Sequence, residues 1–282
     1  MNRLQSLPKF GLAAYGAAAI ILGVFGFVWQ DFAVNWQRVP YGFQGRAGLA
    51  CAVAACELLA GVAILSRRFA RAGAMLLTFV YAIFTTLWVI QALKAPAIYD
   101  SWGNVFEEFS LFAAGLAACA TLAPPGSRWA GKAHRVARIY GISAISFGVD
   151  HIVYWRAAST WVPAWLPPGQ VFWIFFTAIC FLLAATAILS GIRARLAAAL
   201  LTAEILGFEI FVWIPRFIAG PHDHFNWSGN AINLAMMSAA WVVADAFSTS
   251  PPQTKTASAP ANAIPDPTHS ISLSPSANSL AR

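Results

Sequence analysis

The stretch FGVDHIVYWRAASTWVPAWLPPG, residues 147–169, decides the reading of this chain. Here an apolar helix that carries Asp150 and His151 runs into a turn rich in Trp and Pro. An ionisable side chain inside an apolar segment is costly in lipid, whereas Trp rings are typical of the headgroup boundary. The stretch therefore marks both a membrane interface and a candidate site.

The composition of the whole chain points to the membrane as well. Of its 282 residues, 59% are hydrophobic and 10% are charged, against roughly 45–50% and 25% in soluble domains. The formal net charge is +7, but the basic residues fall in the short connections between apolar segments. Orientation in the bilayer and contact with anionic lipid explain them, so we expect the lipid bilayer as partner and no nucleic acid. The four Cys lie in apolar stretches without a CxxC pair, which favours buried small side chains.

Eight apolar windows are long enough to cross a hydrocarbon core of about 30 Å. They predict an all-α, polytopic membrane protein with spans near 10–30, 46–65, 70–93, 104–123, 138–156, 170–190, 194–217 and 228–248. The first window is too long for the apolar core of a secretory signal, and no small-residue cleavage site follows it.

If the eight spans cross the membrane in alternating directions, the connections between them lie on two sides. Lys and Arg are distributed unevenly between these two sides. Thirteen fall with the termini and the even-numbered connections, namely Arg3, Lys9, Arg67, Arg68, Arg71, Arg128, Lys132, Arg135, Arg138, Arg193, Arg195, Lys255 and Arg282. Five fall on the other side, namely Arg38, Arg46, Lys94, Arg156 and Arg216. The bias predicts a multi-pass protein of a bacterial cytoplasmic (inner) membrane with both termini cytoplasmic.

A shift of the sequence by 126 positions brings the four apolar segments of each half into register. Trp29 then falls on Trp155, and Asn104 falls on Asn230. Four spans per half require both halves to have the same orientation. We predict two tandem four-helix bundles at 1–123 and 138–248, joined by a cytoplasmic linker at 124–137. The Ser-, Pro- and Ala-rich residues 249–282 predict a disordered cytoplasmic tail.

Several ionisable residues sit inside the predicted spans. Asp150 and His151 diverge by about 100° on a helix, so each is expected to face a different neighbouring helix. Glu209 is expected to pair with His151 or Arg216, because an intramembrane carboxylate pairs inside the protein or takes up a proton. For Glu107 and Glu108, in the first turns of their predicted helix, we expect stabilisation of the helix N-terminus.

A binding pocket is predicted on the outward side of the second half. Its candidate ligand-binding residues are His151, Tyr154, Trp155, Glu209, Trp213 and Arg216. In the loop before the last helix, His222, Asp223 and His224 alternate imidazole and carboxylate, which is a weak signal for a divalent metal because both groups ligate zinc. A solvated loop is the competing interpretation. No dinucleotide, P-loop, nucleophile-elbow or haem motif is present, so the residues name no reaction and no catalytic group.

The second half resembles the DoxX family of bacterial membrane proteins, which includes the DoxX-like and DoxD branches. The resemblance rests on Gly148 and His151, on the Pro-rich turn at 162–168, on the basic stretch opening at Arg193, and on Ile214-Pro-Arg216. It covers about 110 residues, from Tyr140 to Phe247. Residues 10–123 look like a diverged copy that has Phe25 where the second half has His151 and that lacks the Pro-rich turn.

The resemblance implies a cytoplasmic-membrane protein linked to redox or quinone processes, with a quinone as the implied cofactor class. Three functions stay open. The first is a redox-associated protein that offers its outward pocket to a quinone-like or other small apolar molecule. The second is a non-catalytic scaffold or partner subunit of a membrane or peripheral oxidoreductase. The third is a small-molecule transporter. Transport favours a polar path through the whole membrane, and the scarcity of acidic residues toward the cytoplasmic side counts against it.

Overall fold

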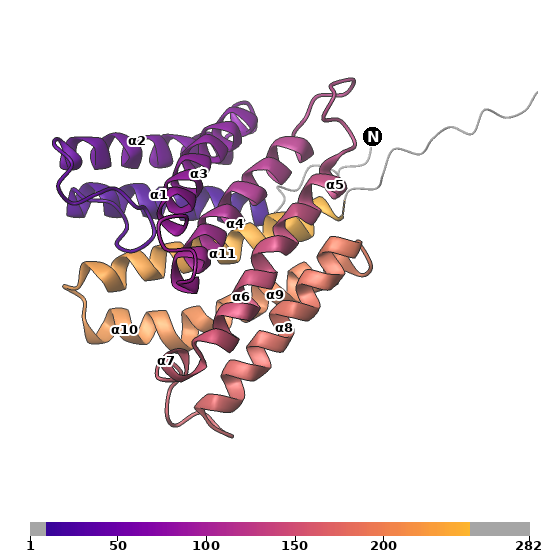
Figure 1. The fold of residues 1–282 in the computed structure, drawn as a ribbon. Helices are drawn as coiled ribbons and strands as arrows, with labels where there is room; N and C mark the ends of the chain where they lie inside the picture. The colour runs from indigo at the N-terminus through magenta and orange to yellow at the C-terminus, as the bar shows by residue number, and fades with distance from the viewer. Residues whose placement is uncertain (1–9, 249–282) are drawn as a thin grey trace, which may run out of the picture. The chain divides into compact units, whose positions relative to one another are not determined.

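The computed structural model describes residues 10–248. Arg3, Lys9 and the predicted tail at 249–282 lie outside the described residues. The helices are α1 (Phe10–Trp29), α2 (Arg46–Leu65), α3 (Ala70–Ala92), α4 (Tyr99–Thr121), α5 (Ala133–Ala137), η2 (Arg138–Tyr140), α6 (Gly141–Val153), α7 (Trp155–Ser159), α8 (Gln170–Ser190), α9 (Ala194–Phe208), η3 (Glu209–Trp213), α10 (Ile214–Ala219) and α11 (His224–Ala246). Figure 1 shows them in chain order.

The eight predicted apolar segments all form helices, and their ends differ where polar residues continue a helix. α4 begins at Tyr99 instead of residue 104, so Glu107 and Glu108 lie more than two turns inside it. The expected helix N-terminal role of these two acids is therefore wrong. Helical structure before α6 also extends back to Ala133, into residues that the sequence assigned to the linker. Hydropathy cannot register these extensions, because it scores polarity and not backbone conformation.

The helix that follows α8 changes its winding at η3, a π-helical turn just before Pro215. Proline has no backbone N–H and its ring crowds the carbonyl four residues earlier, so a regular α-helical turn cannot run through it undisturbed. A wider turn accommodates the disturbance and lets the helix continue to Ala219. The π turn also sets where Glu209 and Trp213 point, since both belong to it.

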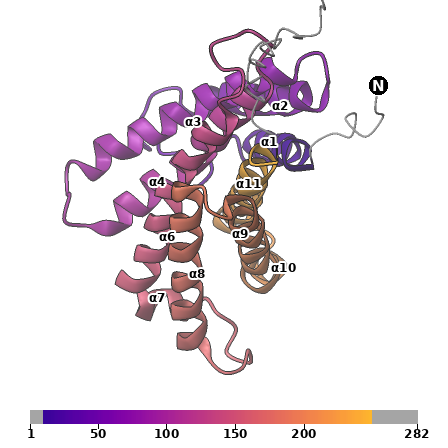
Figure 2. The same ribbon diagram turned by 90° about the vertical axis from the view of Figure 1, so that its right-hand side faces the viewer.

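Each long helix packs against the next one along the chain, and the series of contacts closes on itself. α4 packs against α6, and α11 packs against α9 and then back against α1 and α4. Figures 1 and 2 both show α11 beside α1. One hydrophobic core includes buried residues from both halves, from Tyr15 to Ala246. The two halves therefore share a core, and their division into two bundles stays a prediction.

Six helical stretches are long and apolar enough to cross a membrane: α1, α2, α3, Ala133–Val153, α8 and Ala194–Ala219. α4 and α11 have 23 residues each but carry more polar side chains. More than half of their residues are buried, against about a third in α1, α2 and α8. Protein, not lipid, surrounds them, so polar groups are tolerated there. The chain is thus an all-helical, multi-pass membrane protein.

Small residues let the helices approach closely. A Cβ on Gly11 would lie 2.6 Å from the backbone of Trp241, so α1 touches the backbone of α11. A Cβ on Gly16 would lie 3.0 Å from the carbonyl oxygen of Gly61 on α2. Four alanines of α4, at 113, 114, 117 and 118, are all buried. Van der Waals contact along these faces holds the helices together.

Candidate functional site

A cavity of about 610 Å³ lies at the end of the helices where the loops 30–45 and 154–169 are found. Residues of both halves line it. From the first half come Asn35, Trp36, Arg38, Trp88, Asp100, Gly103, Asn104 and Glu107. From the second half come, among others, Phe147, Asp150, His151, Tyr154, Trp161, Phe181, Phe208, Trp213, Phe225 and Asn233. A cavity of this size, lined by aromatic and other apolar side chains with several polar groups among them, is typical of small-molecule sites.

Asp150 and His151 diverge at the end of α6, as predicted. The Asp150 carboxylate lies over Gly103 of α4, where an added Cβ would be only 3.2 Å from Oδ1. The His151 ring lies instead between Phe181 and Phe208, with ring centroids 5.3 and 5.8 Å away. One end of α6 thus presents a carboxylate toward α4 and an imidazole toward α8 and α9.

The tautomer of His151 follows from its one hydrogen bond. Nδ1 lies 2.8 Å from the backbone carbonyl oxygen of Phe147. A carbonyl oxygen only accepts, so Nδ1 carries the hydrogen and donates it. In the neutral ring Nε2 is then an acceptor. His151 therefore offers the cavity a hydrogen-bond acceptor.

The polar side chains of α4 form one stripe along the cavity. Asp100, Gly103, Asn104 and Glu107 have the spacing i, i+3, i+4, i+7 of a single helical face. The start of α4 is tied to the second half, because the backbone N–H of Asp100 donates to the Tyr154 hydroxyl at 3.0 Å. Three carboxyl groups, counting Asp150, face a cavity whose lining contains one cationic side chain, Arg38. Carboxyl groups therefore outnumber cationic side chains in the cavity lining.

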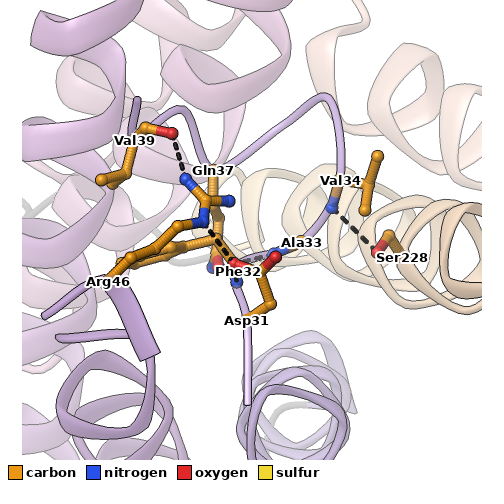
Figure 3. Close-up of polar contacts among 8 residues, drawn as sticks. All are labelled: Asp31, Phe32, Ala33, Val34, Gln37, Val39, Arg46 and Ser228. Carbon is orange, nitrogen blue, oxygen red and sulfur yellow. Dashed lines mark hydrogen bonds and ion pairs between the residues drawn. The ribbon is translucent and has the colours of Figure 1, made fainter. Parts of the chain in front are cut away.

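The loop 30–45 forms the first-half wall of the cavity, and Figure 3 shows what fixes it. Nε of Arg46 lies 2.7 Å from Oδ1 of Asp31, and Nη1 of Arg46 donates to the carbonyl oxygen of Val39. The backbone N–H of Val34 donates to Oγ of Ser228 on α11 at 2.9 Å. The loop is therefore anchored to both α2 and α11.

An aromatic cluster closes the cavity between the halves. The Trp213 ring lies 5.7 Å from Trp36, 5.5 Å from Trp161 and 5.9 Å from Phe225, measured between centroids. The Arg216 guanidinium carbon lies 4.0 Å from the centroid of the Trp161 ring. Cation–π contact of this kind holds the cation behind the aromatic wall instead of in the cavity.

An apolar groove of about 660 Å³ runs along α8 and α9 beside the cavity. Val162, Phe208 and Val212 line both spaces. The rest of the groove lining is almost entirely apolar, with Glu204 and Arg193 as its ionisable side chains other than Cys180. Leu183 and Leu200, in the groove, expose 65% and 62% of their surface, as lipid-facing side chains do. A polar cavity and a lipid-facing groove therefore meet at Phe208 and Val212.

The six predicted ligand-binding residues divide into two groups. His151, Tyr154 and Trp213 line the cavity, and Trp155, Glu209 and Arg216 do not. Trp155 packs on Phe175. The expected pairing of Glu209 with His151 or Arg216 is wrong: Oε2 of Glu209 accepts from Nδ2 of Asn233 at 2.7 Å. The direction in which Glu209 points around its helix, which the sequence does not fix, is toward Asn233 of α11.

In the loop before α11, two of the three predicted metal-binding residues make structural contacts. Asp223 caps α11 by accepting from the N–H of Phe225 at 2.9 Å, and the His224 ring stacks on Trp29 at 4.5 Å. His222 is exposed. Within residues 10–248 no group of three or more His, Cys, Asp or Glu side chains is arranged to hold a metal ion. The capping role explains the acid at this position without a metal.

The sequence analysis missed the cavity residues of the first half. Asp100, Asn104 and Glu107 carried a usable signal, because their helical spacing marks one polar face. The predicted start at residue 104 cut that face in two and concealed it. The wall residues Asn35, Trp36 and Arg38 carried no comparable signal, since a loop shows no periodicity.

Comparison of the chain with protein-family models, with curated proteins and with solved structures found no match, so the DoxX resemblance stays a prediction.

Proposed function

We propose that this chain is a DoxX-like protein of a bacterial cytoplasmic membrane in which α4 and α11 also cross the bilayer, giving eight spans. The 23-residue length of both helices suffices for a crossing, and their polar faces are covered by protein. The excess of Lys and Arg with the termini and even-numbered connections supports two cytoplasmic termini. A duplicated four-helix unit is supported by two equivalent contacts between the halves. The last helix of the first half, α4, packs on α6 of the second half, and the last helix of the second half, α11, packs on α1 of the first half.

For the cavity, we propose that it binds the head of an amphipathic, lipid-soluble molecule of the quinone class, in its reduced form. The groove along α8 and α9 would hold the apolar tail, and the cavity would hold the polar head. The observation that carries this proposal is the meeting of the two spaces at Phe208 and Val212. Such a ligand would enter sideways from lipid, without passing through water.

The reduced form follows from the hydrogen-bonding character of the cavity. His151 Nε2 accepts, and so do the carboxyl groups of Asp150 and Glu107 when they are ionised. A hydroquinone offers two O–H donors, which match them, whereas an oxidised quinone offers only acceptors. Burying acceptors against acceptors would leave each without a partner, at a cost of about 1–3 kcal/mol per group. The side chains support binding in this form and name no reaction.

The first test is purification of the full chain in mild detergent, followed by organic extraction and mass analysis. A co-purified quinone or quinol is expected. The purified protein is then melted with a hydroquinone that carries a long apolar tail, with the tailless hydroquinone as comparison. At about 100 times the Kd, a ligand stabilises the protein by about 2.7 kcal/mol. A stoichiometric partner protein with no small molecule would instead favour the scaffold function.

Matched variants separate the head site from the tail site. His151→Phe keeps a ring between Phe181 and Phe208 and removes Nε2, so binding of both hydroquinones should weaken. Gly207→Leu fills the groove, where nothing lies within 4 Å of Gly207, and should weaken only the tailed ligand. Trp155→Phe, outside the cavity, should leave binding unchanged. Equal binding by His151→Phe and wild type would refute the head site.

A further inference from the structure

The interior of the first half contains a polar cluster that is separate from the cavity. Each of the helices α1 to α4 contributes one residue, and each of the four is only 1% exposed: Tyr15, Glu57, Tyr81 and Glu108. The Tyr15 and Tyr81 rings lie 6.3 Å apart between centroids. α1 packs on α2, α2 on α3, and α3 on α4. The cluster therefore lies where these four helices meet, surrounded by apolar core.

Among the residues that the structure describes, Glu108 has no hydrogen-bond partner for either carboxyl oxygen. Tyr15 is close, but its hydroxyl donates to the carbonyl oxygen of Leu111 at 2.8 Å. Leu111 is three residues after Glu108, on the same face of α4, so Tyr15 faces that side of the helix without bonding the acid. A carboxyl group buried in this way is unusual, because buried polar groups almost always have partners.

Within residues 10–248, the hydrogen-bond partner of Glu57 comes from the loop 30–45. Its Oε1 accepts from Nε2 of Gln37 at 2.6 Å. Gln37 is itself held by the N–H of Ala33, which donates to Oε1 of Gln37 at 3.1 Å, in the loop shown in Figure 3. Gln37 binds one oxygen of the Glu57 carboxyl group, and a carboxyl group has a second oxygen that can accept. A protonated Glu108 would supply the donor.

The surroundings of the two carboxyl groups contain no compensating cation. The charges of Glu57 and Glu107 both act on Glu108. Tyr15 and Tyr81 are the other ionisable groups that interact with them, and Tyr15 also interacts with Cys119. Among the described residues no Lys or Arg acts on either acid. Two ionised carboxylates cannot share such a site, since like charges and burial both disfavour ionisation.

We propose that Glu57 and Glu108 form a proton-binding site that retains at least one proton at neutral pH and exchanges it with the cavity through Glu107. Binding converts one carboxylate to a carboxylic acid, whose O–H then donates to the other carboxyl group; release returns the proton to the carboxylate of Glu107. Glu107 and Glu108 are adjacent on α4 and about 100° apart, so one lines the cavity while the other faces the cluster. This site does not depend on what the cavity binds.

Infrared spectroscopy of the full chain in lipid nanodiscs at neutral pH tests the site directly. The spectrum of wild type minus Glu108→Gln, or minus Glu57→Gln, should show loss of the carbonyl stretch of a protonated carboxyl group. Asp31→Asn is the matched control: Asp31 is ion-paired with Arg46, so only carboxylate bands should be lost. Loss of carboxylate bands alone in both Glu variants would overturn the proposal.

The route to the cavity has its own measurement. In Glu107→Gln the protonated-carboxyl band should remain, and its shift after transfer to heavy water should be slowed by roughly a hundredfold, the size typical of a lost acid–base group. An unchanged exchange rate would overturn the route. If the Glu57 and Glu108 variants fail to fold, wild type with ¹³C-labelled Glu decides, since absence of any labelled protonated-carboxyl band refutes the site.

Discussion

Gly229 on α11 lies directly under the Trp213 ring, and the substitution Gly229→Ala should displace that ring. A Cβ built on Gly229 would be 1.8 Å from Cζ3 and 2.1 Å from Cη2 of Trp213. Carbon atoms in contact lie about 3.5–4.0 Å apart, so the ring would have to retreat by close to 2 Å. Trp36, Trp161 and Phe225 surround it with centroids within 6 Å, so the cavity that Trp213 lines is the direction left open to the ring.

Two opposing effects set the size of the change in stability. Overpacking in a filled core costs about 1–3 kcal/mol. Replacing a helical Gly by Ala contributes up to about 1 kcal/mol in the other direction. Gly229→Ala should therefore lose roughly 1–2 kcal/mol of unfolding free energy. The displaced ring should also move into the cavity and weaken hydroquinone binding, since Trp213 lines it.

Thermal unfolding in detergent measures this effect, with Gly48→Ala as the matched control. Gly48 is also helical, and nothing lies within 4 Å of an added Cβ, so that variant should gain stability. The double variant Gly229→Ala/Trp213→Leu closes a mutant cycle, and most of the Gly229→Ala penalty should vanish when the ring is absent. If Gly229→Ala and Gly48→Ala melted alike, the inferred overlap would be wrong.

Three further predictions follow from single contacts or from the topology. Asn233→Leu removes the hydrogen-bond donor to Glu209, which is 3% exposed, and should lower the free energy of unfolding by about 1–3 kcal/mol. Glu209→Gln keeps an acceptor and should melt close to wild type. If Glu209→Gln were the less stable of the two variants in thermal unfolding, the hydrogen bond would be contradicted. Arg46→Met should lower the free energy of unfolding by about 1–3 kcal/mol and make the loop 30–45 more sensitive to protease. Arg46→Lys should restore only part of this stability, because Lys cannot bond both Asp31 and Val39 as the Arg fork does. Full stability with Lys would show that charge alone matters. A single Cys at Ser159 in an otherwise Cys-free chain should react with an impermeant thiol reagent from the outer side, and reaction only from the cytoplasmic side would refute the topology.

The positions of the helices could be predicted from the sequence because the bilayer imposes them. An apolar run of about 20 residues in lipid has to satisfy its backbone hydrogen bonds internally, so its length alone predicts a helix. The predicted windows 46–65 and 170–190 coincide with α2 and α8. The divergence of Asp150 and His151 was also predictable, since it depends only on the angle between neighbours on one helix.

The composition of the cavity was decided by tertiary structure alone. The sequence placed a pocket in the second half, but the packing of α4 on α6 brings Asp100, Asn104 and Glu107 of the first half into it. Which helices touch across the halves depends on small residues such as Gly11 and Gly103, whose contacts are unknown until the chain is folded. Hydropathy reports the depth of a side chain and not its direction. For that reason the sequence allowed Glu209 and His151 to pair, and only the rotation of their helices gave them different partners.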